Sequence, residues 1–127
     1  MCDVTPDVEL ALPLDARAVS AARRFLREAV CPVHASAVLE DAELLVSELV
    51  TNGVRYGLPP ITVAVRCRDG SGLTVEVSDS AAREPQPRNA APDDESGRGM
   101  RLVDVISDDW GVSPTDTGKT VWYRLKV

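Results

Sequence analysis

Aromatic residues are scarce in this chain of 127 residues, which has one Phe, two Trp and two Tyr. A core must therefore be built mainly from Val, Leu, Ile and Ala. Hydrophobic residues make up 44% of the sequence, too large a share for a disordered protein. The length predicts a single domain over residues 1–127, with a core that needs no disulfide or metal to hold it together.

Basic residues are also fewer than acidic ones. Lys and Arg number 14 against 20 Asp and Glu, so the net charge is −6 and the isoelectric point is near 4.7. An acidic surface repels phosphate backbones. We therefore expect no nucleic-acid partner.

Cysteines and long apolar runs are few as well. Cys2, Cys31 and Cys67 match no metal-binding spacing, which favours an intracellular chain with structural thiols. No run approaches the roughly 18 apolar residues of a membrane span. The early acids Asp3 and Asp7 do not fit a signal peptide. A cytoplasmic protein without a membrane segment is expected.

The first half of the chain reads as a strand followed by two helices. Residues 8–12 alternate apolar and polar positions and predict a short strand. Asp15 can accept amide hydrogens at the start of a helix that runs to about Val30. A second helix is predicted from about Ser36 to Tyr56, with Gly57 as its C-terminal cap.

The second half switches to an alternation of period two. Residues 61–67 and 73–79 flank a glycine-containing turn and predict a hairpin. Residues 80–96 hold three prolines and no hydrophobic periodicity, and an irregular loop of about 17 residues in a compact domain is often functional. A helix introduced by residues 97–99 and two closing strands, at about 110–113 and 120–127, complete the chain. This order predicts a two-layer α/β sandwich, with helices on one face of a mixed, mostly antiparallel sheet.

Glu48 and Asn52 lie one turn apart on the second predicted helix, within about 40° of each other. A carboxylate and an amide oxygen are ligands that Mg²⁺ accepts together with phosphate oxygens and water. Glu48 could equally orient or deprotonate a nucleophile. In the simplest alternative, Glu48 is solvated and Asn52 is an ordinary residue near a helix end.

Two more segments carry possible nucleotide chemistry. Gly97-Arg98-Gly99-Met100 opens a helix, where glycines admit a phosphate close to the backbone and the first amides attract it. Asp79 ends a strand where the long loop begins, and its carboxylate can accept a hydrogen bond from an exocyclic amine such as that of adenine. Each segment also has a plain interpretation as a turn.

Taken in order, these segments resemble the GHKL ATPase superfamily, the Bergerat ATP-binding fold of histidine kinases, gyrase and Hsp90. ELVTNGVRYG (48–57) is similar to its N box, and VSDS (77–80) stands where its adenine box begins. GRGMRLVDVISDDWGV (97–112) resembles its phosphate box and following helix, and GKTVWYRL (118–125) its closing strand. The chain looks most like the stand-alone anti-sigma-factor serine/threonine kinases.

The resemblance implies a role for each matching position. Asn52 would bind Mg²⁺, Glu48 would act as the base, and Asp79 would bind the adenine amine. Residues 80–96 would form the ATP lid. The remaining positions are Gly97, Gly99 and Met100, which would line the phosphates with Arg98 close to them, and Thr120, which would support the adenine side.

The chain departs from the family pattern in two places. The adenine box is usually DxGxG, but Asp79 is followed by Ser-Ala-Ala-Arg, without a glycine. Glu95 stands where the anti-sigma kinases commonly carry Arg, and a carboxylate there would repel a γ-phosphate. Both departures weigh against phosphoryl transfer more than against ATP binding.

The resemblance therefore implies an ATP–Mg²⁺-binding regulator that transfers the γ-phosphoryl group to a Ser or Thr of a small antagonist protein. It would also hold a sigma-like factor, and a homodimer is a further expectation from the resemblance. The alternative is a non-catalytic nucleotide-binding or partner-docking module that regulates such a factor without phosphoryl transfer. His34, the single histidine, has no preceding pair of dimerisation helices, so a sensor histidine kinase is not expected.

Overall fold

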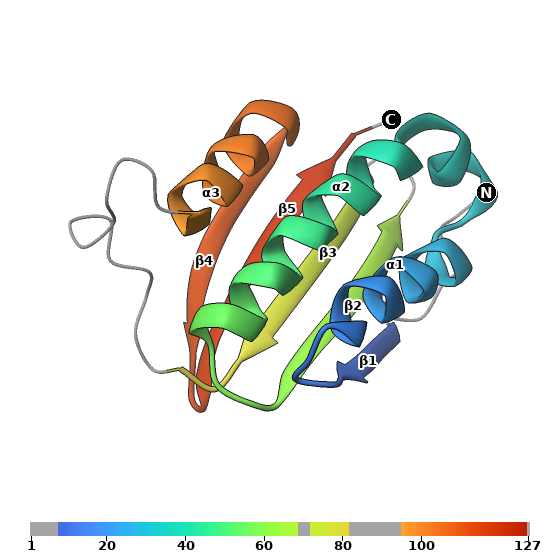
Figure 1. Cartoon of the computed structure of the whole chain (residues 1–127). Coiled ribbons are helices and arrows are strands. Elements are labelled where there is room, and N and C mark those ends of the chain that lie inside the picture. Colours follow the sequence, from blue (N-terminus) through green and yellow to red (C-terminus); the bar gives the residue numbers. More distant parts are fainter. Residues whose placement is uncertain (1–7, 69–71, 82–94, 127) are drawn as a thin grey trace.

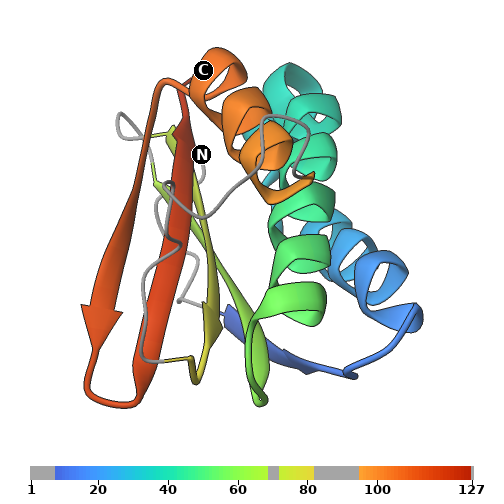
Figure 2. The same ribbon diagram turned by 60° about the vertical axis from the view of Figure 1, so that its left-hand side comes forward.

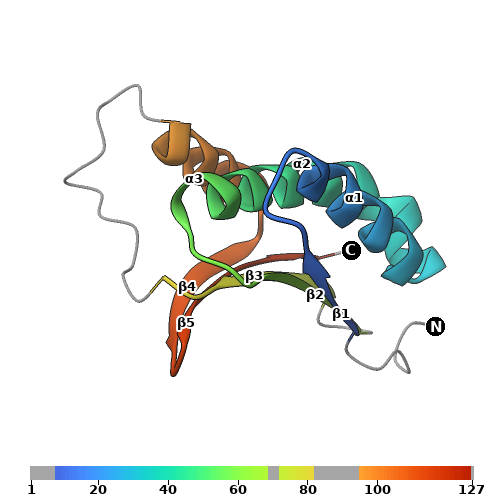
Figure 3. The same ribbon diagram turned by 60° about the horizontal axis from the view of Figure 1, so that its bottom comes forward.

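The computed structural model describes residues 8–68, 72–81 and 95–126. Within these ranges the chain forms one sheet with helices on a single face (Figures 1 and 3). The elements in chain order are β1 (Val8–Leu12), α1 (Arg17–Ala29), α2 (Pro32–Tyr56), β2 (Ile61–Arg68), β3 (Gly72–Asp79), α3 (Glu95–Ile106), β4 (Asp109–Thr115) and β5 (Gly118–Leu125).

The strand order in the sheet is β1-β2-β3-β5-β4, and each neighbouring pair is antiparallel. The predicted two-layer α/β sandwich is confirmed. The two middle neighbours, β3 and β5, come from hairpins far apart in the sequence. Their pairing places Asp79 opposite Lys119. The end of β3 and the start of β5 therefore lie side by side at the same end of the sheet.

The alternation of side chains along β3 and β5 defines the buried face of the sheet. Leu73, Val75 and Val77 are buried on β3, as are Tyr123 and Leu125 on β5. Continuing each series by two-residue steps reaches a charged residue on the same face: Asp79 on β3 and Lys119 on β5. The apolar core therefore ends in a buried pair of opposite charges.

Helix α2 is the central element of the helical layer. Its buried residues pack onto the sheet, and they are Ala42, Leu45, Val46, Leu49 and Val50. The Tyr123 hydroxyl donates a hydrogen bond to the Ala42 carbonyl oxygen at 2.7 Å, which fixes the helix against β5. Burial raises the pKa of Tyr123 well above its usual range, so the phenol remains a donor.

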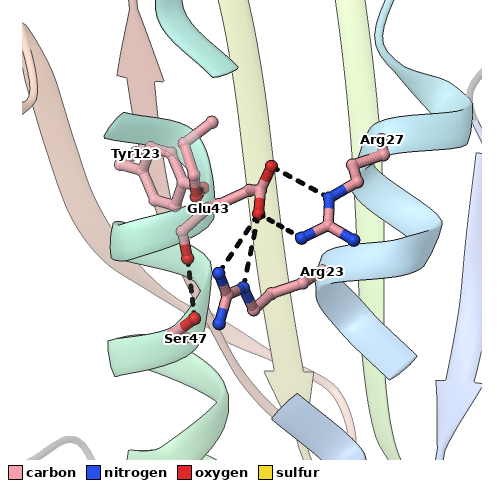
Figure 4. A network of polar contacts seen from close by, with 6 residues as sticks. Arg23, Arg27, Glu43, Ser47 and Tyr123 are labelled. Atoms are coloured by element: carbon pink, nitrogen blue, oxygen red, sulfur yellow. Dashed lines mark hydrogen bonds and ion pairs between the residues drawn. The ribbon is translucent and has the colours of Figure 1, made fainter. Parts of the chain in front are cut away.

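Helix α1 is tied to α2 by a cluster of charges on their outer surface (Figure 4). The Glu43 carboxylate accepts hydrogen bonds from Arg27 at 2.8 and 3.1 Å and from Arg23 at 3.4 Å. The hydrogen bond from Arg27, more than any other contact, holds the pKa of Glu43 below its usual value. A surface hollow of about 440 Å³ lies beside this cluster, lined by Arg23, Glu40, Glu43, Leu44 and Ser47.

The starts of α1 and α2 both differ from the prediction, each in its own way. The Asp15 carboxylate accepts the backbone amide hydrogen of Arg17 at 2.8 Å, but the N-cap residue of α1 is Ala16, so the predicted cap lies one residue too early. Helix α2 begins at Pro32 rather than near Ser36. Proline is favoured at the first helical position because it has no amide hydrogen to satisfy there. The same Pro32 thus separates α1 from α2 and begins the second helix.

The expectation of structural thiols holds for one cysteine in the core. Cys67 is fully buried, and its Sγ lies 3.0 Å from Cys31 Sγ. Cys31, which precedes α2, is disulfide-bonded, so the expectation is wrong for that residue.

Candidate functional site

Asp79 is the most enclosed of those predicted site residues whose burial the structure describes. Its side chain is 5% exposed, and its Oδ1 accepts the backbone amide hydrogen of Ala81 at 2.7 Å. The Lys119 ammonium lies 3.3 Å from Oδ1 and 3.1 Å from Oδ2, and the Lys119 side chain is 11% exposed. The end of β3 therefore presents a buried carboxylate that is paired with a lysine of β5.

Two glycines make room for Asp79, one beside its carboxylate and one beside its backbone. A Cβ atom on Gly57, the residue after α2, would lie 2.8 Å from the Asp79 Cγ and 2.9 Å from its Oδ2. A Cβ atom on Gly118 would overlap the Asp79 carbonyl oxygen. Gly57 has a φ of −90°, so glycine is needed there for space rather than for a left-handed backbone. The predicted cap position is correct, since the Gly57 amide hydrogen bonds to the Gly53 carbonyl oxygen at 2.9 Å.

Glu48 and Asn52 lie on one flank of α2, and both are half-buried. Asn52 is nine residues after Glu43, which at 100° per residue places it on the opposite side of the helix. Glu43 faces α1, and α3 lies on the other side of α2 (Figures 1 and 2). The flank that carries Glu48 and Asn52 therefore faces α3. Asn52 precedes Gly57 by five residues, or about 7.5 Å along the helix axis.

The predicted phosphate segment lies in α3 itself. Because α3 begins at Glu95, Gly97, Arg98, Gly99 and Met100 are helical residues and do not form a turn ahead of the helix. Gly97 falls in the first turn, where amide hydrogens have no partner within the helix. Met100 is half-buried and packs against the core.

The predicted lid at residues 80–96 is corrected at its C-terminal end by the same finding. Glu95 and Ser96 belong to α3, so a loop can extend no further than residue 94. Residues 82–94 lie outside the described part of the chain, and the lid remains an expectation from the sequence.

Thr120 is not brought together with Asp79. It lies opposite Ser78 in the strand register, and the two hydroxyl oxygens are 2.7 Å apart. Because side chains alternate along β5, Thr120 points to the face without helices, whereas Lys119 points to the face with Asp79. The residue that meets Asp79 from β5 is Lys119, which the sequence analysis missed. A lysine in line with Tyr123 and Leu125 on an otherwise apolar face was the signal that could have identified it.

Residues 12–125 match the family of histidine kinase-like ATPase domains. The match covers most of the chain, and the chain belongs to this family. Family membership agrees with the GHKL resemblance and supports ATP binding.

Solved structures show the same fold. The RsbU and RsbW domains of Rv1364c from Mycobacterium tuberculosis share 18% identity with this chain at a TM-score of 0.66, over 96% of this chain and 32% of that one. The histidine kinase domain of the blue-light activated histidine kinase from Erythrobacter litoralis EL346 shares 22% identity at a TM-score of 0.54, over 86% of this chain and 57% of that one. The chain thus spans about a third of the first structure and over half of the second. A comparison with curated proteins finds no match.

The donor set limits how a metal could be held. The described residues contain no group of three or more His, Cys, Asp or Glu side chains that could bind a metal ion. A Mg²⁺ ion that takes most of its ligands from phosphate and water needs only one or two protein oxygens, and Asn52 offers one. The residues present fit Mg²⁺ bound together with a nucleotide rather than alone.

Within the described residues, no helix is long and apolar enough to span a membrane.

Proposed function

We propose that the chain is an ATP–Mg²⁺-binding regulatory protein whose nucleotide lies between α2 and α3, over the end of β3. The observation that carries the proposal is the buried Asp79 carboxylate, held against Gly57 at the end of the helix that carries Asn52 and Glu48. A buried carboxylate at the rim of a core is costly unless it is paired or used. Membership of the histidine kinase-like ATPase family supports the choice of ligand.

Each residue has a distinct task at this site. The Asp79 Oδ2 accepts a hydrogen bond from the exocyclic amine of adenine. The first turn of α3, which includes Gly97, provides unpaired amide hydrogens and the positive end of the helix dipole for the phosphates. Asn52 contributes its amide oxygen to Mg²⁺, which neutralises phosphate charge. Arg98 and Gly99 would continue the phosphate-binding segment, and Met100 would anchor it by its packing against the core.

The reaction that we propose is transfer of the γ-phosphoryl group to a Ser or Thr hydroxyl of a small antagonist protein. The hydroxyl oxygen forms the new bond to the γ-phosphorus, the bond from that phosphorus to the β–γ bridging oxygen breaks, and ADP leaves. Glu48 accepts the hydroxyl proton, one helical turn from Asn52. The other partner would be a sigma-like factor, and the likeness to a structure that contains an RsbW domain supports a regulatory protein of this type.

A second candidate is a docking module that binds a partner without phosphoryl transfer. Lys119 favours it, because the Asp79 carboxylate is already satisfied by an ammonium group when no nucleotide is bound. The absence of a glycine after Asp79 and the presence of Glu95 favour it too. In this case nucleotide would be retained without turnover, or lost.

Two variants on one flank of α2 separate these candidates. Asn52→Ala should weaken Mg²⁺-dependent ATP binding about tenfold or more, because it removes the one amide oxygen offered to the metal. Glu48→Ala should leave binding within about threefold and slow transfer or hydrolysis about 100-fold, as the loss of a general base does. Titration calorimetry and transfer of labelled phosphate to candidate antagonist proteins measure the two effects.

Glu40→Ala is the matched control, since Glu40 is an exposed acid elsewhere on α2 and should change neither quantity. Equal loss of binding in both site variants would show that the roles are assigned wrongly. Tight ATP binding by the unaltered protein, with no transfer and no hydrolysis, would leave the docking module as the function.

A further inference from the structure

Lys119 is a second polar group at the base end of the proposed nucleotide site. It reaches Asp79 across the β3–β5 pairing, where the two residues are opposite each other in register. The adjoining Gly118 keeps the strand close enough for this contact, because any side chain there would overlap the Asp79 backbone. The strand register therefore places Lys119 directly beside the Asp79 carboxylate.

Lys119 and Asp79 have more hydrogen-bond donors and acceptor sites than their contacts with each other and with Ala81 use. An ammonium group has three N–H donors, and a carboxylate has about four acceptor sites. Lys119 Nζ contacts both Asp79 oxygens, and the Ala81 amide hydrogen takes a further site on Oδ1. Among the contacts of the described residues, one acceptor site on Oδ2 and one N–H donor on Nζ remain.

We propose that Lys119 and Asp79 together read the edge of the purine, so that Lys119 determines base specificity. The inference rests on the proposed function. Oδ2 accepts a hydrogen from the exocyclic amine, and Nζ donates to the neighbouring ring nitrogen N1, which is an acceptor in adenine. Guanine in the same position would present a carbonyl oxygen to the carboxylate and an N–H to the ammonium, and both contacts would be repulsive.

The direct test compares ATP with 1-deaza-ATP, in which a C–H group replaces the N1 acceptor. The unaltered protein should bind the Mg²⁺ complex of 1-deaza-ATP about tenfold or more weakly, because a hydrogen bond from a charged donor is lost. In Lys119→Met the two nucleotides should bind within about threefold of each other. Lys126→Met, an exposed lysine just after β5, should discriminate like the unaltered protein. Titration calorimetry below the melting temperature of each protein measures the three ratios of ATP to 1-deaza-ATP affinity, one for each protein.

The outcomes separate this inference from the proposed function. If the unaltered protein binds ATP but not more tightly than 1-deaza-ATP, or if Lys119→Met discriminates as well as the unaltered protein, Lys119 does not read N1, although the nucleotide site stands. If neither nucleotide binds to the unaltered protein, the proposed function fails first. If Lys119→Met does not fold, Lys119→Gln takes its place; because this variant keeps an N–H donor but loses the charge, its preference for ATP over 1-deaza-ATP should be weaker than that of the unaltered protein. The ratio for the unaltered protein still decides whether N1 is recognised.

Discussion

Two charged clusters, one beside α2 and one at its end, differ in a way that separates structure from function. Glu43 meets two arginines whose side chains are 45% and 54% exposed, and its own side chain is 13% exposed. Asp79 and Lys119 come from paired strands and are both buried. The first cluster is a surface link between helices, whereas the second ends the apolar core of the sheet.

The energetic consequences differ accordingly. A solvent-exposed ion pair contributes about 0–1 kcal/mol, because water and salt screen it. A buried pair gains little in stability over an apolar pair, but loss of one member costs about 3–5 kcal/mol, because the other charge remains buried. A buried pair at the rim of the proposed nucleotide site is therefore a candidate for a role in function, while the Glu43 cluster needs no such explanation.

The largest expected effect is that of Asp79→Asn. This variant leaves the Lys119 ammonium buried without its counter-charge, so the free energy of unfolding should fall by about 3 kcal/mol or more. Glu43→Gln, the matched carboxylate-to-amide change in the exposed cluster, should cost about 1 kcal/mol or less. Denaturant titration of both variants measures the difference. Similar losses in the two variants would contradict the distinction between the clusters.

A smaller effect, with a sign that can be tested, is expected at the two glycines near the end of α2. Alanine at Gly57 would place its Cβ 2.7 Å from the Gly53 carbonyl oxygen and 2.8 Å from the Asp79 Cγ, so Gly57→Ala should destabilise the fold by about 1–3 kcal/mol. Alanine at Gly53 would make an ordinary contact with Ile61 at 3.5 Å. Gly53→Ala should therefore be neutral or stabilising by up to about 1 kcal/mol. Thermal melts report both signs, and destabilisation by Gly53→Ala alone would refute the spatial argument.

The smallest effect concerns pH. The hydrogen bond from Arg27, and then the charges of Arg27 and Arg23, lower the pKa of Glu43 below its ordinary value of 4.5. Because the lowered pKa belongs to the folded state, the stabilisation is complete well above pH 4.5 and is lost as the pH falls through the folded-state pKa. The difference in unfolding free energy between the unaltered protein and Glu43→Gln should therefore shrink in acid. If the difference in unfolding free energy between the two proteins grows as the pH falls, the lowered pKa of Glu43 is contradicted.

The sequence predicted those parts of the fold that depend on local pattern. Alternating residues identified the β2–β3 hairpin, and helical spacing identified α2, because each signal repeats over many residues. The start of α3 was misplaced because the glycines at 97 and 99 read as a turn, although they lie inside the helix.

The candidate site was predictable only in part. Glu48, Asn52 and Asp79 were identified from residue type and order. The partner of Asp79 was not, because the strand register that opposes it to Lys119 joins segments 40 residues apart. Thr120 was chosen one position away from that partner, and a shift of one residue on a strand moves a side chain to the other face of the sheet.

The most direct test of the central claim is a calorimetric titration of MgATP into the unaltered protein and into Asp79→Asn, at a temperature where circular dichroism shows both to be folded. We expect saturable heat with one nucleotide per chain for the unaltered protein, and affinity at least about tenfold weaker for Asp79→Asn, because its amide group cannot serve the adenine amine as the carboxylate does. Absence of binding heat in the unaltered protein, or equal affinity in the two proteins, would contradict a nucleotide site at the end of β3.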